Sequence, residues 1–200
     1  AEMHPDYDPE TIAWDLGLVE LEESLVSLSP LCLNSEAVGE DWYGTDIDYV
    51  GWGMTSMDDP MDGYKRTVTI PIVTHNSTHV FTYADGRNIC HGDSGGGAIV
   101  ERDDGSRMLT GVNSYGWDVE TGEYYGCDVE GAGAAAARVD VALDWILPIT
   151  GDITCAAAPA VDPETPETPE DKPTTSLGEG SSDDVKVGCS CSSGGSATGG

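Results

Sequence analysis

The stretch Cys90-His-Gly-Asp-Ser-Gly-Gly-Gly97 decides which fold and which chemistry this sequence encodes. It places Ser94 among glycines, directly before an apolar run. A serine hydroxyl is a poor nucleophile, so it needs a base that takes its proton and backbone N–H groups that bind the oxyanion formed on the attacked carbonyl. Glycines have no Cβ and let the backbone turn sharply and approach a substrate. The stretch therefore predicts a nucleophilic serine in a tight turn, and the alternative is a glycine-rich hairpin without chemistry.

Short apolar or β-branched runs, separated by turn residues, surround this stretch. Residues 97–100 and 108–112 bracket a turn at 103–105 and predict a hairpin. Only residues 139–147 have apolar positions at helical spacing, which predicts a single terminal helix. Other strands are expected at residues 16–21, 48–52 and 65–73. The fold class is therefore all-β, a barrel or a sandwich with one helix.

The charge of the chain excludes several classes of partner. Its 200 residues include 37 acidic and 8 basic ones, which gives a net charge of -29. A surface of this charge repels the phosphates of nucleic acids and anionic lipid head groups, so neither is expected as a partner. No run of about 18 apolar residues is present that would span a membrane.

The six cysteines indicate an oxidising compartment. None forms a C-x-x-C pair, so a zinc ribbon is not supported, and we expect neither a metal nor a cofactor. An even number of cysteines in an acidic, glycine-rich chain points to disulfides and to a secreted or cell-surface protein. The chain begins with Ala1 and shows no secretory signal, so we expect a processed or truncated N-terminus.

The composition changes sharply near residue 156. Residues 156–188 are rich in Pro, Thr and Glu and contain almost no large apolar side chains, so they are expected to form an extended acidic linker. The last twelve residues, 189–200, are Cys, Ser, Gly, Ala and Thr only. This tail is similar to the start of a bacterial surface-sorting tail, which would anchor the protein at the cell surface; the alternative is a flexible end with a local disulfide or free thiols.

Gly92-Asp-Ser-Gly-Gly96 resembles the nucleophile motif of the chymotrypsin/trypsin-like serine proteases. Other segments resemble that family in the same order, and together they cover roughly residues 1 to 150; they are Trp14–Leu21, Ser29–Leu33, Val50–Gly53, Gly111–Gly116 and Ala137–Ile146. The resemblance implies a double β-barrel. Residues 1–28 would be the end of the first barrel, and residues 29–155 the second barrel with its C-terminal helix.

The resemblance also implies a serine endopeptidase that acts on a protein or peptide through an acyl-enzyme. Ser94 would attack the scissile carbonyl, and Asp15 would orient a histidine and stabilise its cation. The backbone N–H groups of Gly92 and Ser94 would form the oxyanion hole. Ser114 would support Asp15, and Asp93 would pair with the amino terminus that activation cleavage creates.

The same resemblance assigns the substrate-binding residues. Asn88 would form the floor of the specificity pocket, and a Cys90–Cys127 disulfide would bridge two of its walls. The other residues expected to contact the substrate are His91, Ser114, Tyr115 and Gly116. Trypsin-type relatives have an aspartate at the floor that pairs with Arg or Lys, and Asn88 lacks that charge. An acidic loop at residues 117–130 is an alternative source of it, so substrate preference stays open.

The family's catalytic histidine has no counterpart in this sequence. It normally precedes the aspartate by about 45 residues, and only fourteen residues precede Asp15. His4 lacks the Ala-x-His-Cys setting, and His75 and His79 are expected to be structural or solvated. We therefore expect a fragment of a longer protease, and a pseudo-enzyme that lost its first barrel is the alternative. Two other functions stay open, a catalytically inactive protease-like binding module and a surface protein in which the acidic stalk matters most.

Overall fold

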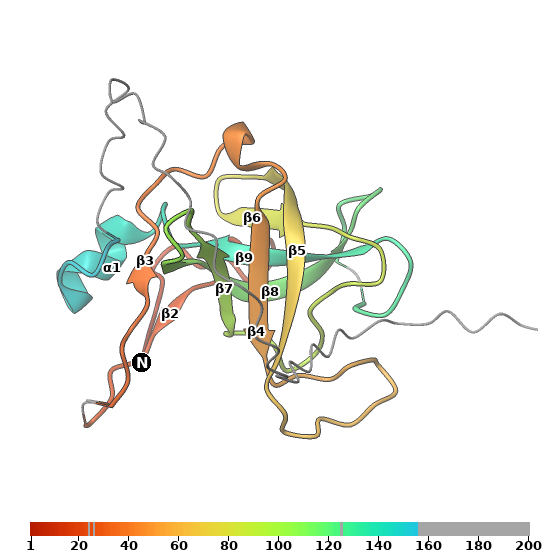
Figure 1. The fold of residues 1–200 in the computed structure, drawn as a ribbon, viewed down its shortest axis with the longest axis horizontal. Coiled ribbons are helices and arrows are strands. Elements are labelled where there is room, and N and C mark those ends of the chain that lie inside the picture. Colours follow the sequence, from red (N-terminus) through yellow and green to blue (C-terminus); the bar gives the residue numbers. More distant parts are fainter. Residues whose placement is uncertain (24, 26, 125, 156–200) are drawn as a thin grey trace, which may run out of the picture. The chain divides into compact units, whose positions relative to one another are not determined.

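Six antiparallel strands of the computed structural model close into a β-barrel (Figure 1). Around the barrel the strands follow the order β4-β5-β6-β9-β8-β7, and β7 pairs with β4 to close the ring. Their bounds are Asp46–Gly51 (β4), Arg66–His75 (β5), His79–Thr82 (β6), Gly97–Glu101 (β7), Arg107–Asp118 (β8) and Ala132–Arg138 (β9). The structure describes residues 1–23, 25, 27–124 and 126–155, so the predicted linker and tail lie outside it.

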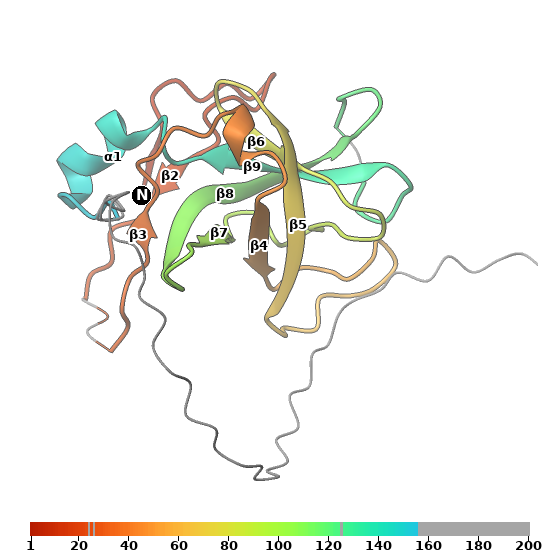
Figure 2. The same ribbon diagram turned by 45° about the horizontal axis from the view of Figure 1, so that its top comes forward.

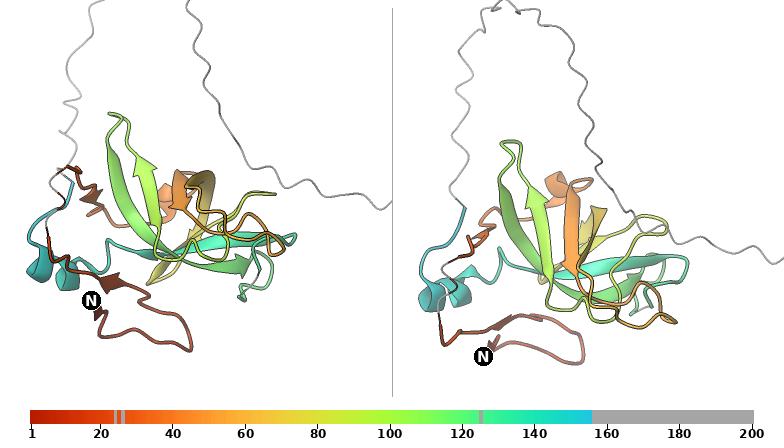
Figure 3. Two further views of the ribbon diagram at one scale, coloured as in Figure 1. Left: turned by 90° about the horizontal axis from the view of Figure 1, so that it is seen from below. Right: turned by 60° about the horizontal axis from the view of Figure 1, so that its bottom comes forward.

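The remaining elements are short. A strand β3 (Cys32–Leu33) runs parallel to β8, and β1 (Glu2–Met3) pairs with β2 (Gly17–Leu18) in a separate two-stranded sheet. One 3₁₀ turn, η1 (Glu40–Trp42), precedes β4, and the helix α1 (Leu143–Thr150) follows β9. The predicted hairpin is confirmed as β7 and β8, which extend from the barrel in both views of Figure 3. The strand predicted at residues 16–21 is reduced to its pair of residues in β2.

Alternating side chains of β4 and β5 fill the barrel. Ile47, Tyr49, Ile70 and Ile72 are buried almost completely, as expected for strands that turn every second residue inward. The hydroxyl of Tyr49 accepts a hydrogen bond from Thr82 Oγ1 at 2.9 Å. Burial raises the pKa of Tyr49 well above its usual range, so the phenol stays neutral in the core.

Strand β9 consists of small residues up to its last residue, Arg138, and is buried along its whole length. Ala134 and Ala136 belong to the barrel core, whereas Ala137 packs with the helix on the outside. The strand lies between β6 and β8 and pairs with both. Because both of its faces are covered, alanine fits where a larger side chain would not. Nothing in an alanine run itself predicts a strand, and only the family resemblance indicated one here, a closing strand from Ala137 onward.

A second apolar cluster lies outside the barrel, where α1 packs (Figure 2). It joins Leu16, Leu33, Val139 and Ile146, which come from four separate parts of the chain. The helix begins at Leu143 and ends at Thr150, so it starts later than the predicted span of 139–147. The N–H of Val139 still donates to the carbonyl of Thr110 at 3.1 Å, which keeps this residue with the sheet.

Two disulfides close the fold. The predicted Cys90–Cys127 bridge is confirmed, with Cα atoms 4.9 Å apart, inside the usual range of up to about 7 Å. A second bridge, which the sequence left unassigned, joins Cys32 to Cys155 at a Cα distance of 4.8 Å. It ties β3 to the segment that follows α1.

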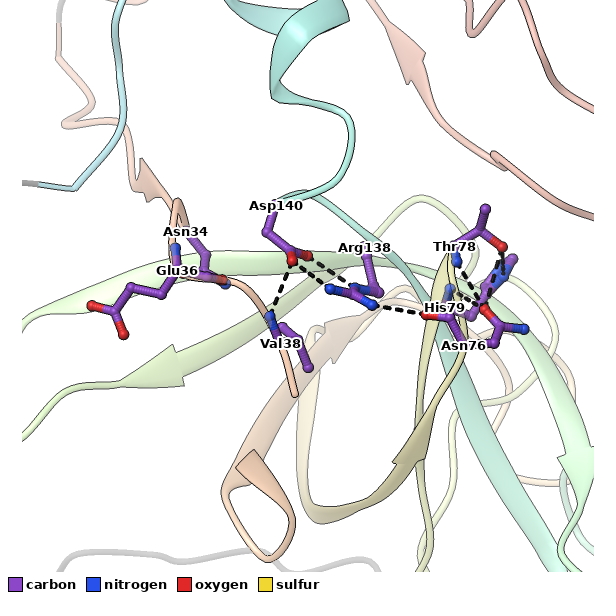
Figure 4. A network of polar contacts seen from close by, with 8 residues as sticks. All are labelled: Asn34, Glu36, Val38, Asn76, Thr78, His79, Arg138 and Asp140. Carbon is purple, nitrogen blue, oxygen red and sulfur yellow. Dashed lines mark hydrogen bonds and ion pairs between the residues drawn. The ribbon is translucent and has the colours of Figure 1, made fainter. Parts of the chain in front are cut away.

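A buried ion pair between Arg138 and Asp140 connects three parts of the chain (Figure 4). Its side chains are only 7% and 3% exposed. Arg138 also donates to the carbonyl of Asn76 at 2.8 Å, and Asp140 accepts the N–H of Val38 at 3.0 Å. The pair therefore holds the end of β9 against the turn between β5 and β6 and against the segment that leads to η1.

We predict that Asp140→Asn destabilises the protein strongly, because it leaves the charge of Arg138 buried without a counterion. The free energy of unfolding should fall by about 3–5 kcal/mol. Glu101→Gln is the matched control, since the Glu101–Arg107 pair is more than half exposed and its loss should cost less than about 1 kcal/mol. Urea denaturation of the two variants measures both values, and equal losses would contradict this account.

Candidate active site

Ser94 lies exposed in the turn that leads into β7. Two backbone hydrogen bonds shape this turn, from Asp93 N–H to the Cys90 carbonyl at 3.1 Å and from Gly96 N–H to the Asp93 carbonyl at 3.0 Å. Gly92 has a φ of 92°, in the left-handed region that disfavours other residues. Gly95 also has a positive φ, of 81°, so glycines on both sides of Ser94 allow the sharp turn.

The carboxylate of Asp93 attaches this turn to the loop between β4 and β5. One oxygen accepts the N–H of Gly53 at 2.7 Å, and the other accepts the N–H of Cys90 at 2.8 Å. The approach is so close that a Cβ on Gly53 would lie 2.7 Å from the backbone nitrogen of Asp93. Glycine is therefore required at position 53. Asp93 uses both carboxylate oxygens to hold backbone.

Asn113 fixes the same turn from β8, and sequence reasoning missed it. Its side-chain amide donates to the carbonyls of Val50 at 3.2 Å and of Asp93 at 3.1 Å. Its backbone carbonyl accepts the N–H of Gly95 at 2.9 Å. The residue is 2% exposed. An amide side chain in the middle of the predicted substrate-binding segment 111–116 is the signal that could have pointed to it, because a polar group buried there needs partners.

The N–H groups of Gly92 and Ser94 have no hydrogen-bond acceptor within the part of the chain that the structure describes. Both residues are exposed, so these donors face solvent. The hydroxyl of Ser94 donates a long hydrogen bond of 3.4 Å to the carbonyl of Ser114. The hydroxyl of Ser94 thus belongs to a turn with two backbone N–H groups, of Gly92 and Ser94, that have no acceptor in the described chain.

Asp15 is joined to β8 by a short hydrogen bond. Ser114 Oγ donates to its carboxylate at 2.6 Å, although the two residues are 99 positions apart. The backbone before Asp15 is strained, because Ile12 and Trp14 have φ values of 57° and 58°. Such values are uncommon for residues other than glycine and unusual for a β-branched one. The structure thus links Asp15 to Ser114 and Ser114 to Ser94, three residues to which the family resemblance assigns roles in one site.

None of the four histidines forms a hydrogen bond with Ser94 or Asp15. His4 is buried, stacked on Trp14 at 4.6 Å and in edge contact with Trp145 at 4.8 Å. His75 bonds through Nδ1 to the hydroxyl of Tyr43 at 3.1 Å.

His79 is buried next to Tyr115 of β8, the strand that also carries Ser114. Its ring contacts Tyr115 edge-on at 5.2 Å, and its Nδ1 pairs with Thr78 Oγ1 at 3.0 Å. Its Nε2 is buried without a partner. Burial lowers the pKa of His79 to about 4, and the charge of Asp15 opposes this shift. A neutral imidazole at this position is a packing element, as predicted.

A small cavity of about 40 Å³ lies beside Ser94, against the Cys90–Cys127 disulfide. Of the five residues expected to contact a substrate, all but Asn88 line this cavity. The full lining is Ile89, Cys90, His91, Ser94, Ser114, Tyr115, Gly116, Tyr124 and Cys127. Asn88 is not in this set. Its side-chain oxygen accepts the N–H of Ile89 at 2.8 Å, and its amide nitrogen lies 3.5 Å from the carbonyl of Cys127. Ile89, which also belongs to the barrel core, contributes to the lining, and Asn88 adjoins it in the chain.

The acidic loop at residues 117–130 contributes no carboxylate to the cavity lining. Asp118 instead accepts the N–H groups of Glu120 and Thr121, which lower its pKa. Asp128 accepts the N–H of Met57 at 2.9 Å. These carboxylates shape loops, and the lining of the cavity carries no fixed negative charge.

The described residues contain neither a candidate metal site nor a candidate membrane span. No group of three or more His, Cys, Asp and Glu side chains in this part of the chain is arranged to hold a metal ion. Likewise, no helix there has the length and apolar character needed to cross a membrane.

Comparison with known proteins agrees with this geometry. The trypsin family model matches residues 1–146. The chain is 28% identical to Trypsin 5G1 of Aedes aegypti over 74% of its own length and 57% of the relative's. It is 31% identical to Mannan-binding lectin serine protease 1 of Homo sapiens over 74% of its length and 22% of the relative's. It is 28% identical to Trypsin-1 of Astacus astacus over 72% of its own length and 63% of the relative's. The chain thus spans less than two thirds of each of these relatives. By its fold, the arrangement around Ser94 and this match, the chain belongs to the trypsin family of serine proteases.

Proposed function

We propose that this protein is a secreted serine endopeptidase in which Ser94 is the nucleophile and Asp15 orients the base. The observation that carries the proposal is the turn at Ser94, where a hydroxyl lies beside two backbone N–H groups without acceptors in the described chain. The adjoining cavity gives a substrate side chain a place next to that hydroxyl. Family membership supports proteolysis as the reaction.

In the proposed reaction, Ser94 Oγ attacks the scissile carbonyl carbon while a histidine removes its proton. The carbonyl oxygen becomes an oxyanion and receives hydrogen bonds from the N–H groups of Gly92 and Ser94. The histidine then protonates the leaving amine, and water hydrolyses the acyl-enzyme by the same steps. Asp15 stabilises the histidine cation. The hydrogen bond from Ser114 keeps the Asp15 carboxylate in the orientation that this role requires.

We further propose that the histidine belongs to a longer polypeptide, in the part of the first barrel that would precede Ala1. His4, His75 and His79 are engaged with other groups, and His91 lines the cavity, but none of the four forms a hydrogen bond with Ser94 or Asp15 within the described residues. Residues 1–28 would then be the end of that first barrel, and residues 29–155 the second barrel. The exposed apolar side chains of Val19, Leu21 and Leu28 support this division, since they would be covered by the rest of the first barrel.

Two disulfides support an extracellular location, because such bonds persist in oxidising compartments. Surface anchoring through residues 189–200 would add to this location, and those residues lie outside the described structure.

The competing proposal is a binding module that keeps the protease scaffold without catalysis. One observation fits it, since no histidine of the described residues bonds to Ser94 or Asp15, whereas the presence of Ser94, Asp15 and both oxyanion donors favours catalysis. The two proposals differ in one measurable property, the nucleophilicity of Ser94.

We predict that a fluorophosphonate probe labels the full-length, activated protein at Ser94. The probe reacts only with a serine whose proton is removed by a base, so Ser94→Ala should abolish labelling. The isolated 200-residue chain should react poorly, because it lacks the base. Labelling is measured by mass spectrometry of the modified peptide. Equal labelling of the wild type and Ser94→Ala would remove Ser94 from the mechanism, and no labelling of either would favour the binding module.

We predict weaker discrimination in favour of Arg and Lys than a trypsin shows. The cavity is lined by Ile89 and the amide of Asn88 adjoins it, so a buried guanidinium or ammonium would find no carboxylate there. An unpaired buried charge costs several kcal/mol, on the order of 3–5. A peptide-library cleavage profile of the active enzyme should show neutral side chains before the cleaved bond.

The matched variants for this prediction are Asn88→Asp and Asp128→Asn. Asn88→Asp should raise kcat/KM for Arg and Lys substrates at least about tenfold, which corresponds to 1.4 kcal/mol of added pairing energy. Asp128→Asn should leave the profile unchanged, because that carboxylate holds the N–H of Met57. Exclusive cleavage after Arg or Lys by the wild type, lost in Asp128→Asn, would assign the charge to the acidic loop instead.

A further inference from the structure

Met61 lies against the glycine that shapes the Ser94 turn. A Cβ placed on Gly92 would be 2.6 Å from the sulfur of Met61 and 3.7 Å from its Cγ, so the thioether occupies the space directly beside Gly92. Met61 belongs to the loop between β4 and β5 and is not part of the cavity lining.

The base of this loop is fixed to the same turn. Met54 N–H donates to the carbonyl of His91 at 2.8 Å, and Gly53 N–H donates to the carboxylate of Asp93 at 2.7 Å. The position of Met61 beside Gly92 is therefore supported by hydrogen bonds on the N-terminal side of the loop. The side chain nevertheless remains open to solvent, since Met61 is 63% exposed.

These observations combine an accessible thioether with a position next to a backbone N–H that has no acceptor in the described chain. A methionine sulfur is readily converted to the sulfoxide, which replaces an apolar group with a polar one. The sulfoxide oxygen is a strong hydrogen-bond acceptor with partial negative charge. At this position it would lie near the donor of Gly92.

We propose that Met61 is an oxidation site through which hydrogen peroxide lowers the activity of the Ser94 centre. The inference rests on the proposed function, in which Gly92 N–H binds the oxyanion. In the step itself, a lone pair of the sulfur attacks one peroxide oxygen and the O–O bond breaks. That oxygen stays on the sulfur as the sulfoxide, and the other leaves with both protons as water. The thioether is oxidised and the peroxide is reduced.

The sulfoxide would act on the transition state. Its oxygen competes for the N–H of Gly92 and repels the negative charge that develops on the attacked carbonyl oxygen. Loss of one oxyanion donor typically lowers kcat by about 10²–10³. Substrate side-chain binding in the cavity involves other residues, so KM should change little.

The other methionines provide internal controls. Met3 is 65% exposed but lies on β1, and Met108 is buried in the barrel at 4% exposure. Met57 is 44% exposed and shares the loop with Met61, and Met54, at the base of that loop, is half-buried. Peroxide should therefore oxidise Met3, Met57 and Met61 and spare Met108. Only the oxidation of Met61 should track the loss of activity.

The test treats the full-length, activated protein with hydrogen peroxide and follows sulfoxide at each methionine by peptide mass spectrometry. Each protein is compared with its own untreated activity. Wild type and Met3→Leu should lose at least about tenfold in kcat as Met61 is oxidised, with KM unchanged within about threefold, as expected for a partial loss of the oxyanion donor. Met61→Leu should keep its activity under the same treatment. Methionine sulfoxide reductase should restore the activity of the treated wild type.

Three outcomes would overturn the inference while leaving the proposed function intact. They are full activity with Met61 oxidised, equal inactivation of Met61→Leu, and no oxidation of Met61 under conditions that oxidise Met3. If the untreated protein neither cleaves peptides nor reacts with the fluorophosphonate probe, the proposed function itself fails and the inference falls with it.

Discussion

The carboxylate of Asp93 is the interaction on which the site depends. It accepts two backbone N–H groups from different segments. One is that of Gly53, on the loop after β4, and the other is that of Cys90, ahead of the serine turn. Asn113 completes the attachment by donating to the carbonyls of Val50 and Asp93. The turn is thus fixed by groups from β4, β8 and its own backbone. Because it is fixed, the donors at Gly92 and Ser94 can stay unpaired and exposed, which is the arrangement that an oxyanion site needs before substrate arrives.

The features that were predictable from sequence are those with a local pattern. Strands β4, β5, β7 and β8 alternate or are rich in β-branched residues, and the Ser94 motif specifies its own turn. Strand β9 could not be predicted from its own residues, because an alanine run becomes a strand only when β6 and β8 cover it on both sides. The helix also begins later than its apolar spacing predicts, since Val139 bonds to Thr110 across the sheet.

In the candidate site, too, residues with a local sequence signal were predictable and residues that depend on distant contacts were not. Ser94 followed from its neighbours, whereas the link between Asp15 and Ser114 spans 99 positions and came from resemblance alone. Asn113 was missed because its partners are 20 and 63 residues away. Whether Asn88 or Ile89 contributes to the cavity lining depends on the backbone dihedral angles of the segment before Cys90. Sequence spacing does not determine these angles, and the structure places Ile89 in the lining.

The Cys32–Cys155 disulfide makes a covalent ring of nearly the whole second part of the described chain, because its two residues are 123 positions apart. A peptide bond broken at any point inside this ring leaves the two pieces joined. The exposed loop that carries Met61 lies within it, and so does the acidic loop after β8. A protein with such a topology can be cut once in either surface loop without releasing the turn that carries Ser94. This retention is covalent and does not depend on the folding equilibrium.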